Sequence, residues 1–197
     1  MPDLSCYKGI VFDMDGTLID SMGTHGQAWQ QTCELYGYPY DRDYLHSLGG
    51  VPTQEIVNML NEKHGHKHDV KKVAETKRQT FLKLEDSPNI IDATFQVMQR
   101  YQGKLKMGVG TGSERNNAIR MLTNSGLLER LETVVTSSDV RFGKPHGETF
   151  ITAATNMGLK PNECVVFEDT EIGRQAARNA GMDCIMVVNG KLVLPKT

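Results

Sequence analysis

The sequence lacks any long hydrophobic run and any closely spaced pair of cysteines. No apolar stretch approaches the roughly 20 residues that a membrane-spanning helix needs, so the 197-residue sequence predicts no membrane span. It also shows no pattern typical of a secretory signal peptide. Because disulfides are rare in a reducing cytoplasm, we expect a cytoplasmic protein with free thiols. The cysteines lie far apart, without a CxxC motif, at Cys6, Cys33, Cys164 and Cys184.

The sequence also lacks an excess of charge of either sign and any low-complexity tract. A formal net charge of −2 gives no electrostatic reason to bind nucleic acid or an anionic membrane, and we expect neither partner. Apolar residues make up 39% and charged residues 23% of the chain, as is typical of a globular protein. A chain of this length accommodates one large domain, or a core with a small insertion.

The chain does contain a repeated alternation of short β-branched runs with helical patterns. Strands are predicted at 8–12, 106–109, 132–136, 163–167 and 183–188. Glycine and then an apolar residue follow each of the helices predicted at 114–125, 148–157 and 171–180. Glycine just past a helix end adopts the left-handed conformation that closes the last turn. This order of elements predicts an α/β fold with a doubly wound, Rossmann-like parallel sheet.

Residues 20–86 interrupt this alternation, because they contain no convincing strand. Helical patterns cover 25–36, 53–64 and 70–84, and polar loops join them. We interpret residues 1–19 and 87–197 as one α/β core. Residues 20–86 then form an α-helical cap inserted after the first strand.

Polar groups follow four of the predicted strands. They are, in chain order, Asp13 and Asp15, then Thr111, Gly112 and Ser113, then Lys144, and finally Glu168 and Asp169. Ligands of an open parallel sheet bind beyond the carboxyl ends of its strands. Carboxylate oxygens suit Mg²⁺, whereas a hydroxyl, backbone N–H groups and an ammonium hold phosphate oxygens. The sequence therefore predicts a site for Mg²⁺ and a phosphate.

Each of these groups has a simpler explanation when taken alone. Acids and glycine are common in turns, Thr111 can cap a helix, and a lysine such as Lys144 is usually solvated. An EF-hand loop is excluded, because its fifth and sixth positions need Asp or Asn and then Gly. Thr17 and Leu18 stand there instead. The combination of all four groups, in this order, is what favours a site.

At these positions the sequence resembles the haloacid dehalogenase superfamily. The matching stretches are DMDGTL at 13–18, VGTGS at 109–113, GKP at 143–145 and VFED at 166–169, in that family's order. The resemblance covers nearly the whole chain, and residues 20–86 resemble the family's small helical cap. Finer features, such as Thr24-His25 with Ala28-Trp29, resemble the β-phosphoglucomutase-like branch. Within that branch the sequence is similar to bacterial phosphatases that act on fructose 1-phosphate and 6-phosphogluconate.

The resemblance implies a covalent mechanism. Asp13 would attack phosphorus and form an aspartyl-phosphate, while Asp15 would act first as acid and then as base. Asp15 favours phosphoryl transfer over carbon–halogen cleavage, because the dehalogenases carry no Asp at this position. The other implied roles are Mg²⁺ binding by the Asp13 side chain, the Asp15 backbone carbonyl, Glu168 and Asp169, phosphoryl orientation by Thr111 and Lys144, and substrate binding by Gly112 and Ser113.

Two cap residues have two explanations each. Lys77 lies within the apolar stripe of helix 70–84, where a lysine commonly snorkels past apolar surface; the resemblance implies a substrate-facing lysine there. His25 also lies on an apolar stripe, as a packing residue or, as the resemblance implies, a partner of the acid/base Asp15. Both are candidate substrate-binding residues. We interpret the group His64, His66 and His68 as surface histidines rather than a metal site.

One departure from the branch bears on the reaction. The mutase carries a cap arginine that grips a second phosphate, and Thr53 stands at that position here. We therefore expect a Mg²⁺-dependent phosphatase for small sugar phosphates such as fructose 1-phosphate. We also expect a monomer. The alternatives are a β-phosphoglucomutase-type isomerase, a phosphate-accepting signalling domain and a non-catalytic binding protein. A signalling domain would take its phosphate on an Asp after the third strand, where Asp139 is the nearest candidate.

Overall fold

The structure is a computed structural model that describes residues 1–84 and 89–193. Its strands and helices are, in chain order, β1 (Gly9–Phe12), α1 (Met22–Tyr36), α2 (Arg42–Ser47), α3 (Thr53–His64), α4 (Val70–Leu84), α5 (Asp92–Tyr101), β2 (Lys106–Gly110), α6 (Arg115–Asn124), β3 (Thr133–Val135), α7 (Glu148–Asn156), β4 (Cys164–Glu168), α8 (Glu171–Asn179), β5 (Asp183–Val188) and β6 (Lys191–Val193). Short 3₁₀ helices at Leu128–Arg130 and Pro161–Glu163 precede β3 and β4.

The strands form one sheet in the order β3-β2-β1-β4-β5-β6. β1 to β5 run parallel, and β6 pairs antiparallel with β5. At the end of the central strand, Phe12 lies opposite Val109 of β2 and Phe167 of β4. This register brings the residues that follow β1, β2 and β4 to one edge of the sheet. The α/β fold expected from the sequence is confirmed.

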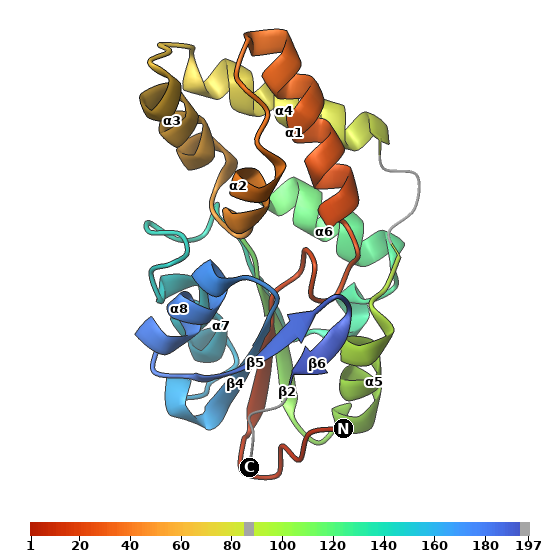
Figure 1. The fold of residues 1–197 in the computed structure, drawn as a ribbon. Helices are drawn as coiled ribbons and strands as arrows, with labels where there is room; N and C mark the ends of the chain where they lie inside the picture. The colour runs from red at the N-terminus through yellow and green to blue at the C-terminus, as the bar shows by residue number, and fades with distance from the viewer. Residues whose placement is uncertain (85–88, 194–197) are drawn as a thin grey trace.

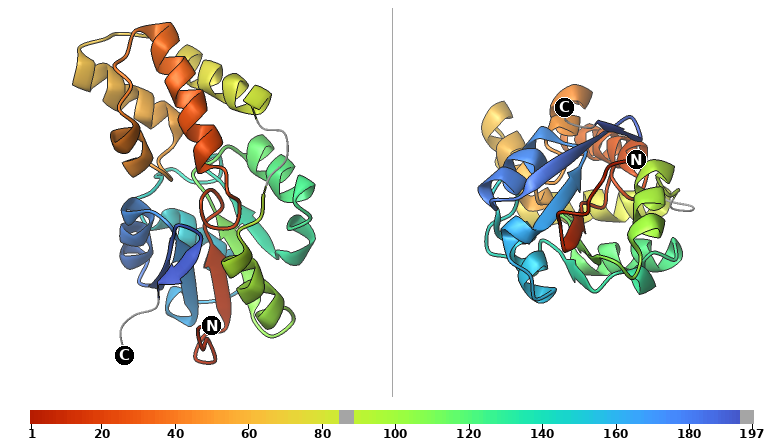
Figure 2. Two further views of the ribbon diagram at one scale, coloured as in Figure 1. Left: turned by 45° about the vertical axis from the view of Figure 1, so that its right-hand side comes forward. Right: turned by 90° about the horizontal axis from the view of Figure 1, so that it is seen from below.

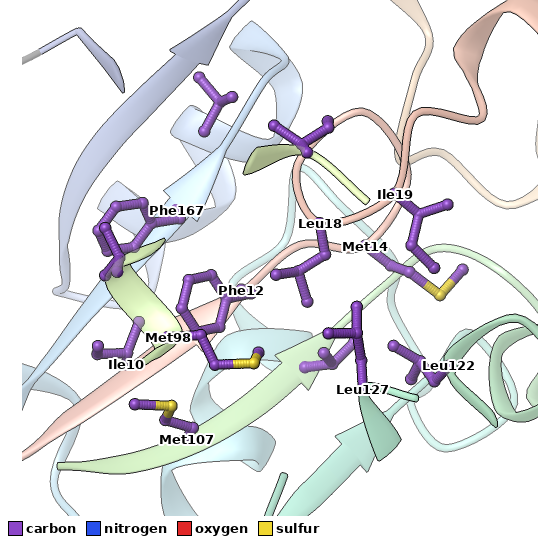
Figure 3. Packing of buried hydrophobic residues seen from close by; sticks show 14 of the residues in the cluster. Ile10, Phe12, Met14, Leu18, Ile19, Met98, Met107, Leu122, Leu127 and Phe167 are labelled. Atoms are coloured by element: carbon purple, nitrogen blue, oxygen red, sulfur yellow. The ribbon is translucent and has the colours of Figure 1, made fainter. Parts of the chain in front are cut away.

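Helices cover both faces of the sheet (Figure 1; Figure 2). On one face, α5 and α6 pack against a cluster that includes Ile10, Phe12 and Phe167 (Figure 3). On the other face, α7 and α8 pack against Val11 and Val166. Every residue of β1 is buried, which explains its continuous apolar run, because a strand covered on both sides has no solvent-facing position.

Helices α1 to α4 form a separate apolar cluster above the carboxyl ends of the strands (Figure 1), and we call this region the cap. Two neighbouring segments connect it to the sheet: Asp20 donates its N–H to the Asn89 carbonyl at 2.8 Å, and Ile91 to the Leu18 carbonyl at 2.9 Å. An insertion requires its two ends to lie close together in this way. The boundary expected between residues 86 and 87 lies outside the described residues, and the two-domain division stays a prediction.

Three elements were missing from the expectations: α2, α5 and β6. The six-residue α2 is too short for a clear apolar period, although α5 buries Val97, Met98 and Tyr101 at helical spacing. β6 follows the turn Asn189-Gly190, whose φ values of 49° and 69° are typical of a tight hairpin. The sheet therefore ends in an antiparallel edge strand, which was absent from the parallel sheet predicted from the sequence.

Other expectations agree with the structure. The bounds of α3 and α4 are those predicted, and the glycines after α6, α7 and α8 have φ values of 68° to 71°. All four cysteines are free. No helix in the described part of the chain is long and apolar enough to cross a membrane. The cytoplasmic location and the monomeric state stay predictions.

Candidate active site

A buried lysine lies between two carboxylates at the carboxyl end of the sheet. The Lys144 ammonium donates to Oδ1 of Asp13 at 2.5 Å and to Oε1 of Glu168 at 2.9 Å. All three side chains are almost fully buried, so Lys144 is not the solvated surface lysine of the simpler explanation. The end of β1 positions Asp13, whose N–H donates to the Phe167 carbonyl at 2.9 Å.

The charges of this cluster do not balance. Burial raises the pKa of Asp13 well above its ordinary value, and Lys144 offsets this only in part. Burial and the nearby Glu168 raise the pKa of Asp169 to about 7. Burial alone would lower the pKa of Lys144, but the Asp13 and Glu168 carboxylates raise it above its ordinary value, so the ammonium stays charged. The cluster would be stabilised by more positive charge than Lys144 supplies.

The same carboxylates have the arrangement of a metal site. Asp13, Glu168 and Asp169 each offer an oxygen within 4.8 Å of the others. Oxygen donors of this kind suit Mg²⁺, and the missing positive charge is what a divalent cation would provide. Oε2 of Glu168 already accepts from the N–H and the hydroxyl of Thr170, at 2.6 and 2.9 Å. Asp13 and Asp169 are therefore the freer ligands, and the residues present fit the metal.

The loop after β1 lies directly against the Asp169 carboxylate at Gly16 and Thr17. This glycine has φ +85°, and a Cβ there would lie 2.2 Å from Oδ2 of Asp169. The Thr17 hydroxyl donates to Oδ1 of Asp169 at 3.2 Å. A side chain at position 16 would displace the Asp169 carboxylate, so the glycine of the DMDGT stretch serves the site as well as the turn.

Asp15 lies in a different environment from Asp13. Its carboxylate accepts from the hydroxyls of Ser21 at 2.6 Å and Ser113 at 2.8 Å, and lies 3.1 Å from Nε2 of His25. Burial favours a raised pKa for Asp15, but the interaction with His25 and the two hydroxyl bonds outweigh it and hold the pKa below its ordinary value. Two carboxyls two positions apart thus have pKa values shifted in opposite directions.

Two cap residues continue this arrangement. Nζ of Lys77 lies 2.6 Å from Nδ1 of His25. Because an ammonium can only donate, Nδ1 accepts, and Nε2 carries the hydrogen that points at Asp15. Burial lowers the pKa of Lys77 to about 8, with the charge of Asp15 acting in the opposite sense. The snorkelling explanation of Lys77 is wrong, because the residue is only 5% exposed and its ammonium lies against His25.

A cavity of about 460 Å³ separates the core from the cap. The expected site residues on its wall are Asp13, Asp15, Thr111, Gly112 and Ser113 from the core, with His25 and Lys77 from the cap. The Thr111 hydroxyl accepts from the Ser113 N–H at 3.1 Å and keeps its own hydrogen to donate. The cavity therefore presents both motif carboxylates and hydrogen-bond donors to the same space.

Three expected site residues lie away from the wall of this cavity. Lys144 and Glu168 are behind Asp13, and Asp169 lines a second cavity of about 260 Å³ instead. A Cβ added to the cap residue Gly50 would lie 3.1 Å from Cδ of Lys144, so the cap loop covers this lysine. In this structure Lys144 acts as a counter-charge to Asp13 and Glu168, and its contact with a phosphoryl group stays a prediction.

The cap loop also lies directly against the core at Gly112. A Cβ there would lie 2.2 Å from the Gly50 carbonyl oxygen, so no larger residue fits without moving the cap. Gly112 therefore permits the close approach of cap and core, in addition to lining the cavity.

Sequence reasoning missed several residues of the site. Ser21 precedes His25 by one helical turn and could have been found by that spacing. Arg42 and His46 line the cavity from α2, a helix that was not among the predicted elements. The available signal was Asp41, a helix-capping residue whose side chain accepts from the Tyr44 N–H at 3.0 Å.

The group of three cap histidines differs from the surface histidines expected. His64, His66 and His68 are half-buried, and His66 and His68 pack edge-on against Tyr38 at 5.1 and 5.2 Å between ring centroids. Within residues 1–84 and 89–193 the metal-type cluster is that of Asp13, Glu168 and Asp169. The rings of His66 and His68 therefore pack around Tyr38, and the expectation that these histidines do not bind a metal stays a prediction.

Comparison with known proteins agrees with this architecture. The model of the haloacid dehalogenase-like hydrolases matches residues 10–187, and the chain belongs to this family. It is 37% identical over 185 residues to the fructose-1-phosphate phosphatase YqaB of Escherichia coli (strain K12), covering 92% of this chain and 96% of that protein. It is 34% identical to the validoxylamine A 7′-phosphate phosphatase of Streptomyces hygroscopicus subsp. limoneus, covering 91% of this chain and 84% of that protein.

A solved structure shares the fold. The crystal structure of β-phosphoglucomutase from Clostridium difficile superimposes with a TM-score of 0.82 at 23% identity, covering 93% of this chain and 85% of that chain. At this level of identity the likeness supports the fold with its helical cap, and leaves the reaction to be argued from the site.

Proposed function

We propose that the protein is a Mg²⁺-dependent phosphatase that hydrolyses small sugar phosphates of the fructose 1-phosphate type through an aspartyl-phosphate. The observation that carries this proposal is the pair of carboxylates after β1, which share one cavity but have opposite environments. Asp13 lies beside a charged lysine and two further carboxylates. Asp15 lies among hydroxyls and an imidazole. The match to a fructose-1-phosphate phosphatase supports the same class of substrate.

In the first half-reaction Asp13 is the nucleophile. Lys144 favours its ionised form, and β1 holds it at the cavity wall. An oxygen of Asp13 bonds to phosphorus as the bond between phosphorus and the sugar oxygen breaks. Bound Mg²⁺ would neutralise the repulsion between the carboxylate and the phosphate. Thr111, with its hydroxyl hydrogen free to donate, orients a phosphoryl oxygen.

Asp15 acts as the general acid in the first half-reaction and as the general base in the second. It gives a proton to the departing sugar oxygen. It later takes a proton from the water that attacks phosphorus, as the bond between phosphorus and the Asp13 oxygen breaks and inorganic phosphate leaves. The arriving phosphate dianion raises the proton affinity of Asp15, which compensates for its low pKa in the free protein. Ser21, Ser113 and His25 hold its carboxylate toward the cavity. Lys77 fixes the imidazole of His25 in the form that donates to Asp15.

The alternative is a β-phosphoglucomutase-type isomerisation. It needs a cation that holds the second phosphate of a bisphosphate intermediate while the sugar reorients. Thr53 lines the cavity without charge, which favours hydrolysis. Arg42 also lines the cavity, so position 53 alone does not decide between the two reactions.

An assay of phosphate release tests the proposal. Purified protein is incubated with fructose 1-phosphate, glucose 6-phosphate and β-glucose 1-phosphate, with Mg²⁺ or with EDTA. We expect phosphate release that requires Mg²⁺, and little glucose 6-phosphate from β-glucose 1-phosphate primed with the bisphosphate. Isomerisation faster than phosphate release would identify a mutase. Undiminished turnover in EDTA would exclude the metal-dependent mechanism.

A further inference from the structure

The short helix α2 presents one face to the active-site cavity. Arg42, Leu45 and His46 are spaced three and four residues apart, and all line the cavity. The helix is well anchored: the Asp41 side chain caps it, and Leu45 packs in the apolar cluster of the cap. In the preceding loop, the Tyr40 hydroxyl donates to the Gly26 carbonyl of α1 at 3.2 Å. Packing and capping thus fix the backbone of Arg42 at the cavity, while its side chain is exposed.

The guanidinium of Arg42 has no partner among the described residues. Its neighbour Asp41 pairs with Lys63, with 3.6 Å between Nζ and Oδ2. The carboxylates that line the cavity in the described part of the chain are Asp13 and Asp15, whose hydrogen bonds go to other groups. Because a guanidinium carries five donors in a planar fork, Arg42 brings both charge and hydrogen-bonding capacity to the cavity that the protein itself does not use.

Lys77 also lines the cavity with a cation, but its ammonium already has a partner in the protein. The ammonium of Lys77 is buried against His25 at 2.6 Å. The cavity volume of about 460 Å³ is within the range for small-molecule ligands. A sugar phosphate with its phosphate at Asp13 would leave its other end to the cap wall, where Arg42 is the unpaired charge among the described lining residues.

We propose that Arg42 is a specificity residue, which binds a negatively charged group at the end of the substrate distal to the transferred phosphate. The inference rests on the proposed phosphatase function and deepens it. Among the small sugar phosphates of the proposed function, esters with a second negative group, on a sugar acid or a sugar bisphosphate, then gain an interaction that fructose 1-phosphate and other esters of neutral sugars do not make. Carboxylate and phosphate share the paired oxygens that a guanidinium binds in a bidentate manner.

Two matched pairs of substrates test this assignment. 6-Phosphogluconate and glucitol 6-phosphate differ only by a carboxylate or a hydroxymethyl group at the distal carbon. Fructose 1,6-bisphosphate and fructose 1-phosphate differ by the second phosphate. Values of kcat and KM are measured for the wild type, Arg42→Gln, Arg42→Lys and the control Lys71→Gln, which removes an exposed cap charge outside the cavity.

We expect Arg42→Gln to lower kcat/KM about tenfold to a hundredfold on the distally charged member of a pair. The effect on the neutral member should be less than threefold, and the loss should lie mainly in KM. Arg42→Lys should retain part of the discrimination, because it keeps the charge but loses the fork. Lys71→Gln should leave all four values near those of the wild type. A loss confined to one pair supports the proposal and identifies the distal group as carboxylate or phosphate.

Equal losses on both members of each pair would overturn the specificity role of Arg42, as would the same pattern in Lys71→Gln. A wild-type protein that releases no phosphate from any of the four esters contradicts the proposed function instead. Calorimetric binding of the same pairs to the wild type and to Arg42→Gln then decides separately on Arg42: it is supported if only distally charged esters bind more weakly, and overturned if binding does not change.

Discussion

The two walls of the active-site cavity are built on different principles. The core wall carries Asp13 and Asp15 just after β1, and both are paired: Asp13 with Lys144 behind the wall, and Asp15 with two serines and an imidazole. The cap wall draws its polar side chains from the four helices α1 to α4, and Arg42 there has no partner among the described residues. Buried groups with fixed partners keep the geometry that the same reaction needs for every substrate. An unpaired charge at the cavity is free to bind a charged group of the substrate.

Asp15 is where the two walls meet. Its partners are Ser113 from the core, and Ser21 and His25 from the start of the cap, with Lys77 behind the histidine. A substitution in the core should therefore lower phosphate release from every substrate. A substitution in the cap should affect mainly those substrates that extend from the transferred phosphate to the cap.

The largest effect should come from the core nucleophile. Asp13→Asn preserves the shape of the side chain but removes the attacking oxygen, which no neighbour can replace. We expect phosphate release to fall by a factor of about 10⁴ or more on every substrate. Steady-state assays check this, with thermal unfolding as the test of an intact fold. Residual turnover near that of the wild type in a folded variant would remove Asp13 from its role.

Asp15→Ala should separate substrates by leaving group. Sugar phosphates depart as poor leaving groups and need a proton, so we expect a loss of about 10²- to 10⁴-fold. The first step on p-nitrophenyl phosphate should lose much less, because nitrophenolate departs without help. Rapid-quench measurement of the phosphorylation step on both substrates provides the comparison. If both fall by the same factor, Asp15 is not the general acid.

Lys144→Met tests the pairing of the core wall. It leaves the carboxylates of Asp13 and Glu168 buried without their counter-charge, which typically costs about 3–5 kcal/mol of folding free energy. Urea unfolding of this variant, beside the exposed control Lys104→Met, measures the difference. A free energy of unfolding equal to that of the control would mean that the buried pairs contribute nothing net to stability.

The smallest effect concerns the buried lysine of the cap. The folded-state pKa of Lys77, about 8, lies below its ordinary value of 10.5, so folding disfavours the charged form. Wild-type stability should therefore rise as the pH increases from about 8 to 10.5, where only the unfolded chain still holds this proton.

Lys77→Met removes this dependence. At pH 7 the variant should be more stable than the wild type, by on the order of 3 kcal/mol, and the advantage should shrink toward pH 10. Urea unfolding at both pH values, with Lys71→Met as the exposed control, tests this. A pH-independent difference between Lys77→Met and the wild type would contradict the burial of a charged Lys77.

The local sequence was sufficient to predict which residues lie at the carboxyl ends of the core strands. A strand covered on both faces must be continuously apolar, and ligands gather at the carboxyl ends of parallel strands, so Asp13, Thr111 and Glu168 could be placed on one rim. The helix stops at Gly126, Gly158 and Gly181 were equally local, because only the residue at the helix end decides the left-handed turn. The family resemblance added roles to these residues, which the structure brings together.

The cap wall was harder to anticipate, because its partners are distant in sequence. Lys77 contacts His25 across 52 positions of the sequence. The residue pattern of neither helix indicates that the two side chains meet. Arg42 was overlooked because α2 has six residues, too few for a hydrophobic period. Asp41 signalled its start, but whether a helix face meets a cavity depends on the packing of Leu45 and Leu48 in the cap.

The sequence by itself determined the α/β core, the helical insertion and the four groups of residues at the strand ends, because backbone propensity, apolar period and turn chemistry act over a few residues. Tertiary structure alone decided that Lys144 pairs with Asp13, that Lys77 is buried against His25 and that Arg42 lines the cavity with no partner in residues 1–84 and 89–193. These depend on which surfaces meet when the chain folds, and the burial that follows sets the pKa of each group.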